Sequence, residues 1–472
     1  MNMSTEKQFD KRSVYNAMSA TGKAIMLTGG NNTHSGNISL RHPNDRESFF
    51  MTTSGSQQGA LVPSDIVPLK FKEVSWGDGR ASTESTIHRR ILSIPGTEAA
   101  IHCHYLSAAS VTFDTKEHQN FLVYEGTTDG LDRFSFSPID CTGAHLLGDV
   151  SSDNYLEPVG SREMEDRIPV YLAQSPVTLV KGHGPFVRGD SLETCLHWLG
   201  LVEASASLKI AARLRGVDTR IISERLRQDG AGALYPFTVR SFDASVLGRY
   251  DTNDANTISA FKERAQFNFY HAISPFGTGS MSEKVTQNEM LYCPTAAAPE
   301  DFEIAILRTD LRESPEDDFQ LAFHKALYRN TSYKTCMFTM SPLANAEAMA
   351  VIFESFGIEA LTHPDSVSID YLDPKDHPVL KPIDAEAVYL NPRVGLTNSD
   401  AGFDVIANML RWHKGACVIT GRGAVGVGNV SLEQAAHHVA SLESIAKIRQ
   451  TIYFNHRLAG APPVSYFEPV TQ

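Results

Sequence analysis

The chain has 472 residues, with a hydrophobic fraction of 42% and a charged fraction of 21%, values that are ordinary for a soluble globular protein of two or three domains. A formal net charge of −13 argues against an extended nucleic-acid surface, and no apolar stretch approaches the roughly 18 residues of a membrane helix. The six cysteines form no Cys-x-x-Cys pair and the N-terminus has no apolar export signal, so we expect a cytoplasmic protein.

The first informative segment is 82–85, with the sequence Ser-Thr-Glu-Ser. It predicts the start of a helix that runs to a Pro-Gly stop at 95–96. Ser82 or Thr83 is expected to cap the free amides, and Glu84 is expected in the first turn, where the helix dipole favours an acid. An acid beside a metal ion is what proton transfer next to a polarised carbonyl requires.

A pair of histidines follows on a predicted strand. Because residues i and i+2 of a strand share a face, His102 and His104 can approach one ion while Cys103 points away. A single histidine is more often a packed or surface residue, and an isolated His-x-His is a ligand pair in a minority of cases. The pair therefore gains weight only from a third ligand and a nearby acid.

The third ligand is expected from His183. The segment Val177–Val180 reads as a buried strand that ends at Lys181, and the glycines on both sides of His183 let the backbone expose its side chain. Three imidazoles with an open position are typical of a catalytic site for one divalent metal rather than a structural one.

The second half of the chain repeats the plan of the first without these ligands. The segment that starts at Glu84 aligns with one that starts at Gln320, at an offset of 236 that also holds for the histidine strand, and the glycine pair around His183 has a counterpart around Arg422. The four proposed metal-site residues are each replaced: Glu84 by Gln320, His102 by Phe338, His104 by Met340, and His183 by Arg422. The second half is therefore expected to have a structural or interface role.

One motif of the second half satisfies a dinucleotide-binding pattern, Gly421-Arg-Gly-Ala-Val-Gly426. The next predicted helix begins only at Ser431, too late for its N-terminus to face a pyrophosphate held by those glycines. We therefore expect a duplicated strand end here and no nucleotide.

The ordered motifs of the first half resemble the class II aldolase/adducin family. They are Gly36-Asn-Ile-Ser39, Thr53-Ser-Gly55, Ser64-Asp-Ile-Val67, Ser82-Thr-Glu84, His102-x-His104 and His183-Gly184. The resemblance implies an α/β, three-layer fold with a mainly antiparallel sheet between helices, in two tandem copies. We expect a metal-binding domain over 8–215 (the first copy), a linker over 216–250, and a degenerate domain without metal ligands over 251–462 (the second copy).

The resemblance also implies roles for individual residues. In the family, the counterparts of His102, His104 and His183 bind the metal, and the counterpart of Glu84 serves as acid/base or resting ligand. A phosphate pocket is implied for small and hydrogen-bonding residues, namely Gly36, Asn37, Ser54, Gly55, Ser82 and Thr83. Family members often take a second acid, a tyrosine, from a neighbouring subunit, and Tyr124 is the candidate here.

These roles predict a metal-dependent carbon–carbon lyase, an aldolase that cleaves a phosphorylated hydroxycarbonyl sugar through a metal-stabilised enediolate. Departures from the family pattern at Thr53 and Ser85 leave the substrate open, and the alternative reaction is that of a dehydratase or decarboxylase acting on a related sugar phosphate or sugar acid. A second alternative is a non-catalytic, adducin-like interaction module, because adducin shares the fold that the resemblance implies and the second half has lost the ligands. One divalent metal per chain is expected, zinc first, with manganese, cobalt, nickel and iron as alternatives. The resemblance implies a homo-oligomer, and we expect neither nucleic acid nor membrane as a partner.

Overall fold

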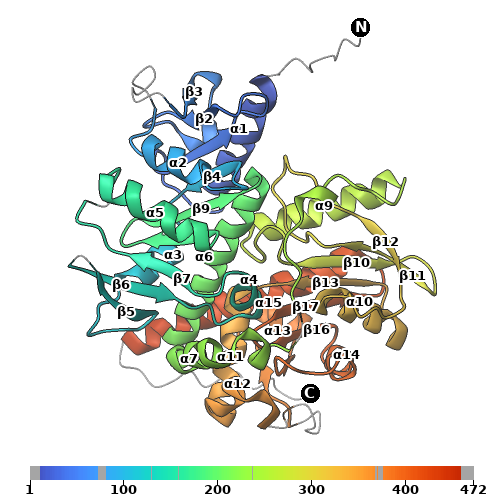
Figure 1. Cartoon of the computed structure of the whole chain (residues 1–472). Coiled ribbons are helices and arrows are strands. Elements are labelled where there is room, and N and C mark those ends of the chain that lie inside the picture. Colours follow the sequence, from blue (N-terminus) through green and yellow to red (C-terminus); the bar gives the residue numbers. More distant parts are fainter. Residues whose placement is uncertain are drawn as a thin grey trace. The chain divides into compact units, whose positions relative to one another are not determined.

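The computed structural model describes residues 11–72, 81–128, 130–157, 159–236, 238–366, 369 and 376–458. The chain forms two compact units (Figure 1). Unit 1 comprises Met1–Phe113, Tyr124–Ser135 and Val150–Leu199, and unit 2 comprises Asp114–Val123, Phe136–Asp149 and Gly200–Gln472. The first sheet belongs almost entirely to unit 1 and the second sheet to unit 2.

The first sheet has nine strands in the order β3-β2-β1-β4-β9-β8-β7-β6-β5. Neighbours from β3 to β8 pair antiparallel, whereas β7 and β8 are parallel. The strands are β1 Asn37–Arg41, β2 Ser48–Thr52, β3 Ile66–Lys70, β4 Ala99–His102, β5 Leu122–Thr128, β6 Leu131–Phe136, β7 Val150–Asp153, β8 Val177–Val180 and β9 Gly184–Gly189.

Helices lie on both faces of this sheet. On one face, α2 (Ser85–Leu92) and α5 (Arg162–Gln174) bury apolar side chains against Ala100 of β4 and Phe186 of β9. On the other face, the N-terminal part of α6 (Leu192–Leu214) approaches Gly189 of β9 and the carbonyl of Ala99, and α1 (Lys11–Leu27) contacts β1. Strand alternation therefore turns His102, two residues after Ala100, toward α2 and its N-terminus.

The second sheet has eight strands in the order β12-β11-β10-β13-β17-β16-β15-β14. Its pairings are antiparallel except for parallel β15 and β16. The strands are β10 Ser280–Lys284, β11 Glu289–Cys293, β12 Leu307–Asp310, β13 Thr335–Thr339, β14 Val379–Leu380, β15 Val394–Thr397, β16 Ala416–Ile419 and β17 Gly423–Gly428. The first seven positions of this order match those of the first sheet, strand for strand.

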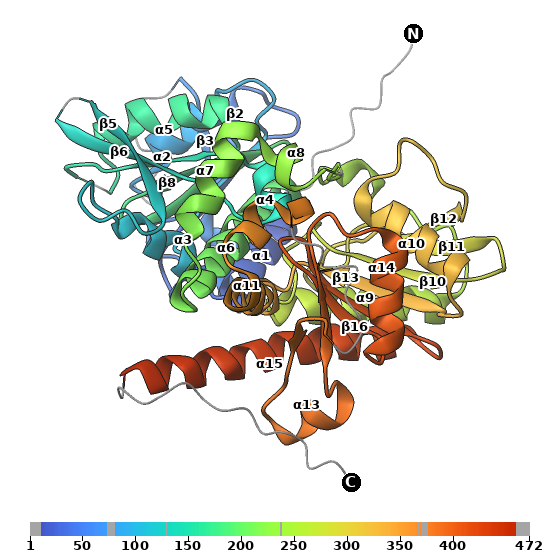
Figure 2. The ribbon, with the colours of Figure 1, turned by 90° about the horizontal axis from the view of Figure 1, so that it is seen from below.

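The second sheet is also enclosed by helices. One face packs against α10 (Phe319–Asn330) and α14 (Phe403–Trp412), and the other meets α15 (Leu432–Leu458), where Gly426 lies against the backbone of Ala435. Figure 2 shows α15 as one long helix, which packs against α11 (Pro342–Phe356) and also contacts α9 (Ala255–Tyr270). The remaining short helices are α3 Leu106–Ser110, α4 Cys141–Leu146, α7 Thr219–Asp229, α8 Ala231–Leu234, α12 Glu359–Thr362 and α13 Ala385–Leu390.

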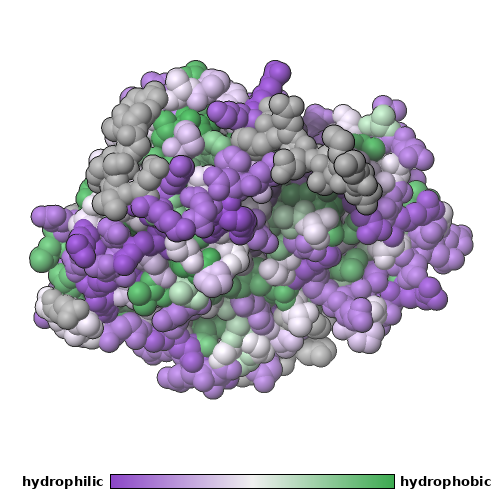
Figure 3. All heavy atoms as spheres, turned by 45° about the horizontal axis from the view of Figure 1, so that its top comes forward, coloured by the Kyte–Doolittle hydropathy of each residue, from purple (hydrophilic) through white to green (hydrophobic). Residues whose placement is uncertain are grey.

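The predicted three-layer α/β fold with mainly antiparallel sheets in two copies is confirmed. The dinucleotide-like motif lies in the tight turn between antiparallel β16 and β17, with Gly426 inside β17, so no helix follows it directly. None of the described helices is both long and apolar enough to cross a membrane. The side chains visible in Figure 3 are mostly hydrophilic, and the apolar ones lie mainly near the middle of the view.

Candidate metal centre

Three imidazoles of unit 1 converge as the sequence predicts. Nε2 of His102 lies 3.1 Å from Nε2 of His104 and 3.0 Å from Nε2 of His183. The candidate ligand atoms of the three residues all lie within 4.8 Å of one another. Nitrogens around a tetrahedral cation bound at 2.0–2.1 Å are about 3.4 Å apart, so the spacing of this cluster fits one divalent metal ion.

The tautomer of His102 is fixed by the backbone. Its Nδ1 lies 3.0 Å from the carbonyl oxygen of Pro185, and because a carbonyl only accepts, Nδ1 carries the proton. Nε2 is then the atom with the free lone pair, which is the state a metal ligand needs. Burial, and then the charge of His104, hold the pKa of His102 well below its usual value, so the ring is neutral.

The two other histidines are positioned by loops. β4 ends at His102, so His104 lies just past the strand and not on it, which corrects the prediction of a strand through both residues. Its amide donates to the carbonyl of Gly30, at 2.7 Å, and to Oδ1 of Asn31, at 3.1 Å. These two hydrogen bonds hold the backbone there in place of a strand partner. Burial lowers the pKa of His104 as well.

His183 occupies the tight turn between β8 and β9. Gly182 and Gly184 both have positive φ, +66° and +133°, and a Cβ on Gly184 would overlap the carbonyl oxygen of Cys103. Only glycine allows this close approach of the turn to the chain beside His104. The predicted strand over Val177–Val180 is confirmed, and the flanking glycines form the turn, but the His183 side chain is only 10% exposed, so the predicted exposure is wrong.

Glu84 borders the imidazole cluster. Its Oε1 lies 3.9 Å from Nε2 of His183, and its Oε2 lies 4.0 Å from Nε2 of His102. α2 begins at Ser85, so Glu84 is the N-cap and not a residue of the first turn, and its amide contacts Oγ of Ser82 at 3.4 Å. The position before the helix places the carboxylate over the end of β4 rather than along the helix surface.

The carboxylate of Glu84 is held in a fixed direction. Nδ2 of Asn37 donates to Oε2 of Glu84 at 2.7 Å and also to Oγ of Ser82 at 3.1 Å. Burial raises the pKa of Glu84, against the charge of His183 and the hydrogen bond from Asn37, which lower it. A buried carboxyl with a raised pKa holds a proton more readily than an exposed one, which suits a group that takes and returns a proton.

Only some of the residues expected to bind phosphate contact the Glu84 carboxylate or its partners. Gly36 and Asn37 lead into β1, and Ser82 and Thr83 precede α2. An isolated bridge between Thr53 and Ala81 brings together the chain segments that carry Ser54-Gly55 and Ser82-Thr83. Ser54, Gly55 and Thr83 are exposed, whereas Asn37 and Ser82 are buried and bonded to each other.

Tyr124 does not join the cluster within one chain. It lies on β5, at the far edge of the first sheet, where its hydroxyl bonds the side chain of Thr127 at 2.7 Å. β4 and β5 are five strand steps apart, and at about 4.8 Å per step this separation is about 24 Å. Any contact between Tyr124 and a metal centre therefore needs a second copy of the chain.

Several supporting residues were missed in the sequence. The ring of Phe186 stacks on His102 at 4.0 Å between centroids, and the carbonyl of Pro185 sets the tautomer. Strand alternation after Gly184 places Phe186 on the core face and could have identified it. The carbonyl of Pro185 and Oδ1 of Asn31 leave no such signal, because their roles depend on how loops meet.

Comparisons with known proteins identify the family of this chain. The sequence profile described as "Class II Aldolase and Adducin N-terminal domain" matches residues 16–210 and 250–450. A methylthioribulose-1-phosphate dehydratase of Microcystis aeruginosa is 30% identical over 183 residues, covering 38% of this chain and 85% of that protein. One from Alcanivorax borkumensis is 24% identical over 217 residues, covering 43% and 94%. The solved L-fuculose-1-phosphate aldolase of Thermus thermophilus is 24% identical, covers 43% of this chain and 95% of its own, and has a TM-score of 0.36. The chain belongs to the class II aldolase and adducin family.

Proposed function

We propose that the first copy is a metal-dependent lyase that removes water from a phosphorylated hydroxycarbonyl sugar. The observation that carries this proposal is the convergence of three imidazoles beside the buried carboxylate of Glu84, with Nε2 of His102 3.1 Å from that of His104 and 3.0 Å from that of His183. Dehydration is favoured over carbon–carbon cleavage because the similar curated proteins are named methylthioribulose-1-phosphate dehydratases. Aldol cleavage remains the second candidate, since both reactions begin from the same activated carbonyl.

The proposed metal is one divalent cation per chain, held by His102, His104 and His183. Three neutral nitrogen donors suit zinc first, although manganese, cobalt, nickel and iron accept the same ligands. When bound, the cation supplies Lewis-acid stabilisation of the negative charge that develops on the substrate's carbonyl oxygen.

Glu84 is the proposed base. In a dehydration, its carboxylate takes the proton from the carbon next to the carbonyl, and the hydroxyl on the following carbon leaves as water after it receives a proton. The hydrogen bond from Asn37 keeps the carboxylate oriented toward the imidazole cluster. Burial of Glu84 excludes solvent from this proton transfer.

The substrate phosphate is proposed to bind beside this carboxylate. Exposed Ser54, Gly55 and Thr83 offer hydroxyl and amide donors, and Ser82 lies between them and Asn37. Gly36 is a spacer in this proposal, because a side chain there would meet the carbonyl oxygen of His102 at 2.6 Å.

Tyr124 is proposed as the second acid, acting on the metal centre of another copy in a homo-oligomer. Mixed assembly tests this role. Tyr124→Phe and Glu84→Gln chains, each inactive alone, should regain part of the turnover when refolded together, because some sites then combine an intact Tyr124 with an intact Glu84. Absence of any recovery in a mixed oligomer would rule this role out.

The reaction itself is tested with ketose 1-phosphates and purified, metal-loaded protein, followed by carbon NMR. Dehydration leaves one carbon skeleton that has lost water, whereas aldol cleavage gives two shorter fragments. A protein that binds no metal and converts none of these compounds would instead support the adducin-like interaction module. The Glu84→Gln variant serves as the background control for adventitious activity.

A further inference from the structure

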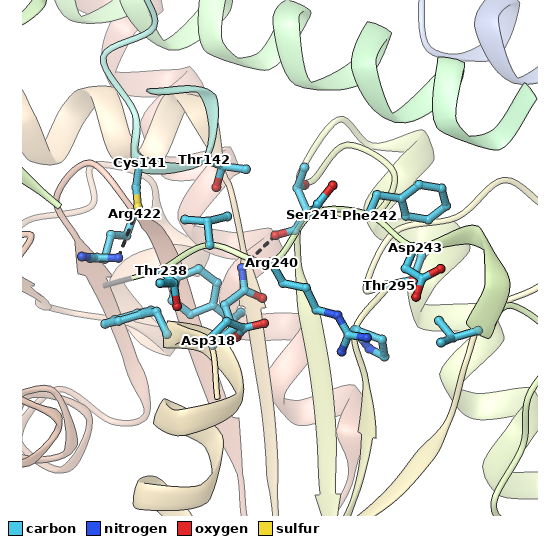
Figure 4. A pocket seen from close by; sticks show the side chains of 18 residues that line it. Cys141, Thr142, Thr238, Arg240, Ser241, Phe242, Asp243, Thr295, Asp318 and Arg422 are labelled. Atoms are coloured by element: carbon cyan, nitrogen blue, oxygen red, sulfur yellow. Dashed lines mark hydrogen bonds between the residues drawn. The ribbon is translucent and has the colours of Figure 1, made fainter. Parts of the chain in front are cut away.

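A pocket lies in unit 2 at the position that corresponds to the metal centre of unit 1. It encloses an empty volume of about 640 Å³, part of it open to solvent, and its lining includes Arg240, Thr278, Thr295, Gln320, Phe338 and Arg422 (Figure 4). Gln320, Phe338 and Arg422 are the counterparts of Glu84, His102 and His183. The second copy has therefore kept a pocket where it lost the metal ligands.

Parts of the backbone around this pocket repeat those around the metal centre. A Cβ on Gly279 would meet the carbonyl oxygen of Phe338 at 2.6 Å, as a Cβ on Gly36 would meet that of His102 at 2.6 Å. The turn around Arg422 repeats the pair of positive φ angles, with +77° at Gly421 and +144° at Gly423. These two features are kept while the side chains differ, so the chemistry of the pocket has changed on a related frame.

The new chemistry includes two guanidinium groups. The guanidinium of Arg422 takes the place of an imidazole and is held by the carbonyl of Ser399, at 2.5 Å, and by Sγ of Cys141, at 3.2 Å. It also lies 4.1 Å from the ring centroid of Phe319. Arg240 supplies a second guanidinium from the chain segment that borders the pocket (Figure 4). Two arginines beside threonine hydroxyls are the groups that bind phosphate or carboxylate.

Two carboxylates in the same lining restrict which anion fits. Oδ1 of Asp318 accepts the amide of Leu321 at the start of α10, and Oδ1 of Asp243 accepts the amide of Ser245. Together with Arg240 and Arg422 they leave the pocket without net formal charge. A bare or highly charged anion is repelled by the carboxylates, whereas hydroxyl groups of a ligand can donate to them.

We propose that this pocket binds a small hydroxylated phosphate ester and does not convert it. Binding follows from the arginines, the hydroxyls and the carboxylates of the lining. Conversion is excluded because Gln320 cannot take a proton as a carboxylate does, and Phe338 and Met340 cannot hold a metal ion. The second copy would then sense a metabolite of the class proposed for the first copy. That sensing role rests on the proposed function, whereas binding itself is argued from the lining of this pocket.

Calorimetric titration of the full, metal-loaded chain with glycerol 3-phosphate tests this inference. The compound has no carbonyl and is not consumed. We expect two binding sites per chain, one in each copy. Arg240→Ala should weaken one of them by about tenfold or more, because a charge-assisted hydrogen bond is lost. Arg240 is exposed, so this variant is expected to fold. Arg312→Ala, an exposed arginine paired with Asp310 outside the lining, is the matched control and should bind as the unchanged chain does.

Two further variants and a second probe test whether the second binding site is this pocket. Arg422→Lys keeps the charge but not the planar fork, and should also weaken the second site. Ser54→Asp should abolish the first site and leave the second intact. Inorganic phosphate should bind the second site more weakly than glycerol 3-phosphate does.

Unchanged affinity in both arginine variants, or equal binding of the two probes, would overturn the proposal. So would complete loss of binding in Ser54→Asp. Turnover is measured separately, so a failure here leaves the lyase proposal standing.

Discussion

The two copies of this chain keep one frame and differ in the chemistry placed on it. Seven strands follow the same order in both sheets, and the glycine contacts beside His102 and Phe338 have the same length. Yet three imidazoles face a carboxylate in the first copy, whereas an arginine, two apolar side chains and an amide stand in the second. The comparison teaches that the same strand order and turns can be kept without the three histidines and the carboxylate.

A buried histidine common to both copies supports the same view. Nδ1 of His88 bonds Oγ of Ser39 at 2.6 Å, and Nδ1 of His324 bonds Oγ of Ser282 at 2.5 Å. Both rings are fully buried, that of His88 on α2 and that of His324 on α10. Because this pair survives where the ligands do not, its role is to join helix to sheet and not to serve the metal.

The largest effect is expected when His183 of the first copy is replaced by arginine, the residue at the corresponding position of the second copy. We expect His183→Arg to lose the metal and to lower turnover on the order of 10³–10⁴-fold, because a ligand becomes a cation beside the ion site. Metal analysis and turnover with a ketose 1-phosphate measure this outcome. A variant that keeps both its metal and its activity would show that His183 is not a ligand.

The next substitution also copies the second half. Glu84→Gln should retain about one metal per chain and lose turnover by 10²–10⁴-fold, on the order of the effect of a general base. Glu117→Gln, an exposed glutamate outside the site, is the control and should turn over normally. Unchanged turnover in Glu84→Gln would rule out the proposed proton transfer.

A pair of glycine variants separates effects on the stability of the fold from effects on metal binding. A Cβ on Gly184 would overlap the carbonyl oxygen of Cys103, and one on Gly423 would overlap that of Thr339. We expect Gly184→Ala and Gly423→Ala each to lower the free energy of unfolding by about 1–3 kcal/mol. Only Gly184→Ala should also weaken metal binding, which denaturation and metal titration would show. Equal metal affinity in the two variants would show that this turn does not position His183 for metal binding.

The smallest expected effect concerns His88 and His324, the buried histidines that both copies share. Burial lowers the pKa of His88 and of His324 to about 3, so each is neutral in the folded chain while the unfolded chain binds a proton near pH 6.5. Stability is therefore full above pH 6.5 and is lost as the pH falls toward 3, by about 2 kcal/mol per histidine between pH 7 and pH 5. Urea unfolding at both pH values should show a fall about 2 kcal/mol smaller in His324→Gln. An identical fall in that variant and the unchanged chain would refute this account.

Much of this site could be predicted from the sequence because its ligands follow simple rules. The His-x-His spacing indicated that His102 and His104 meet, although His104 lies past the end of the strand, and the glycines around His183 mark a tight turn. The position of Glu84 before α2, and the loop that holds His104, were not predicted correctly. Both depend on contacts made by Ser82, Gly30 and other residues distant in the chain.

The pocket of the second copy could not be predicted either. Its counterparts of the ligands were visible as losses, at Gln320, Phe338 and Arg422. Arg240 reaches this pocket because of the path of the chain segment before α9. No hydrophobic periodicity in the sequence predicts that path. The domain boundaries at 215 and 251 stay predictions, as does the part played by Tyr124.

The most direct test of the central claim is X-ray absorption spectroscopy at the metal edge, combined with metal analysis of the full chain. We predict one divalent ion per chain with three imidazole nitrogens at about 2.0–2.1 Å, lost together in a His102→Ala, His104→Ala variant. A metal-free native protein, or an ion whose ligands persist in that variant, would contradict the claim that these three histidines form a single metal centre.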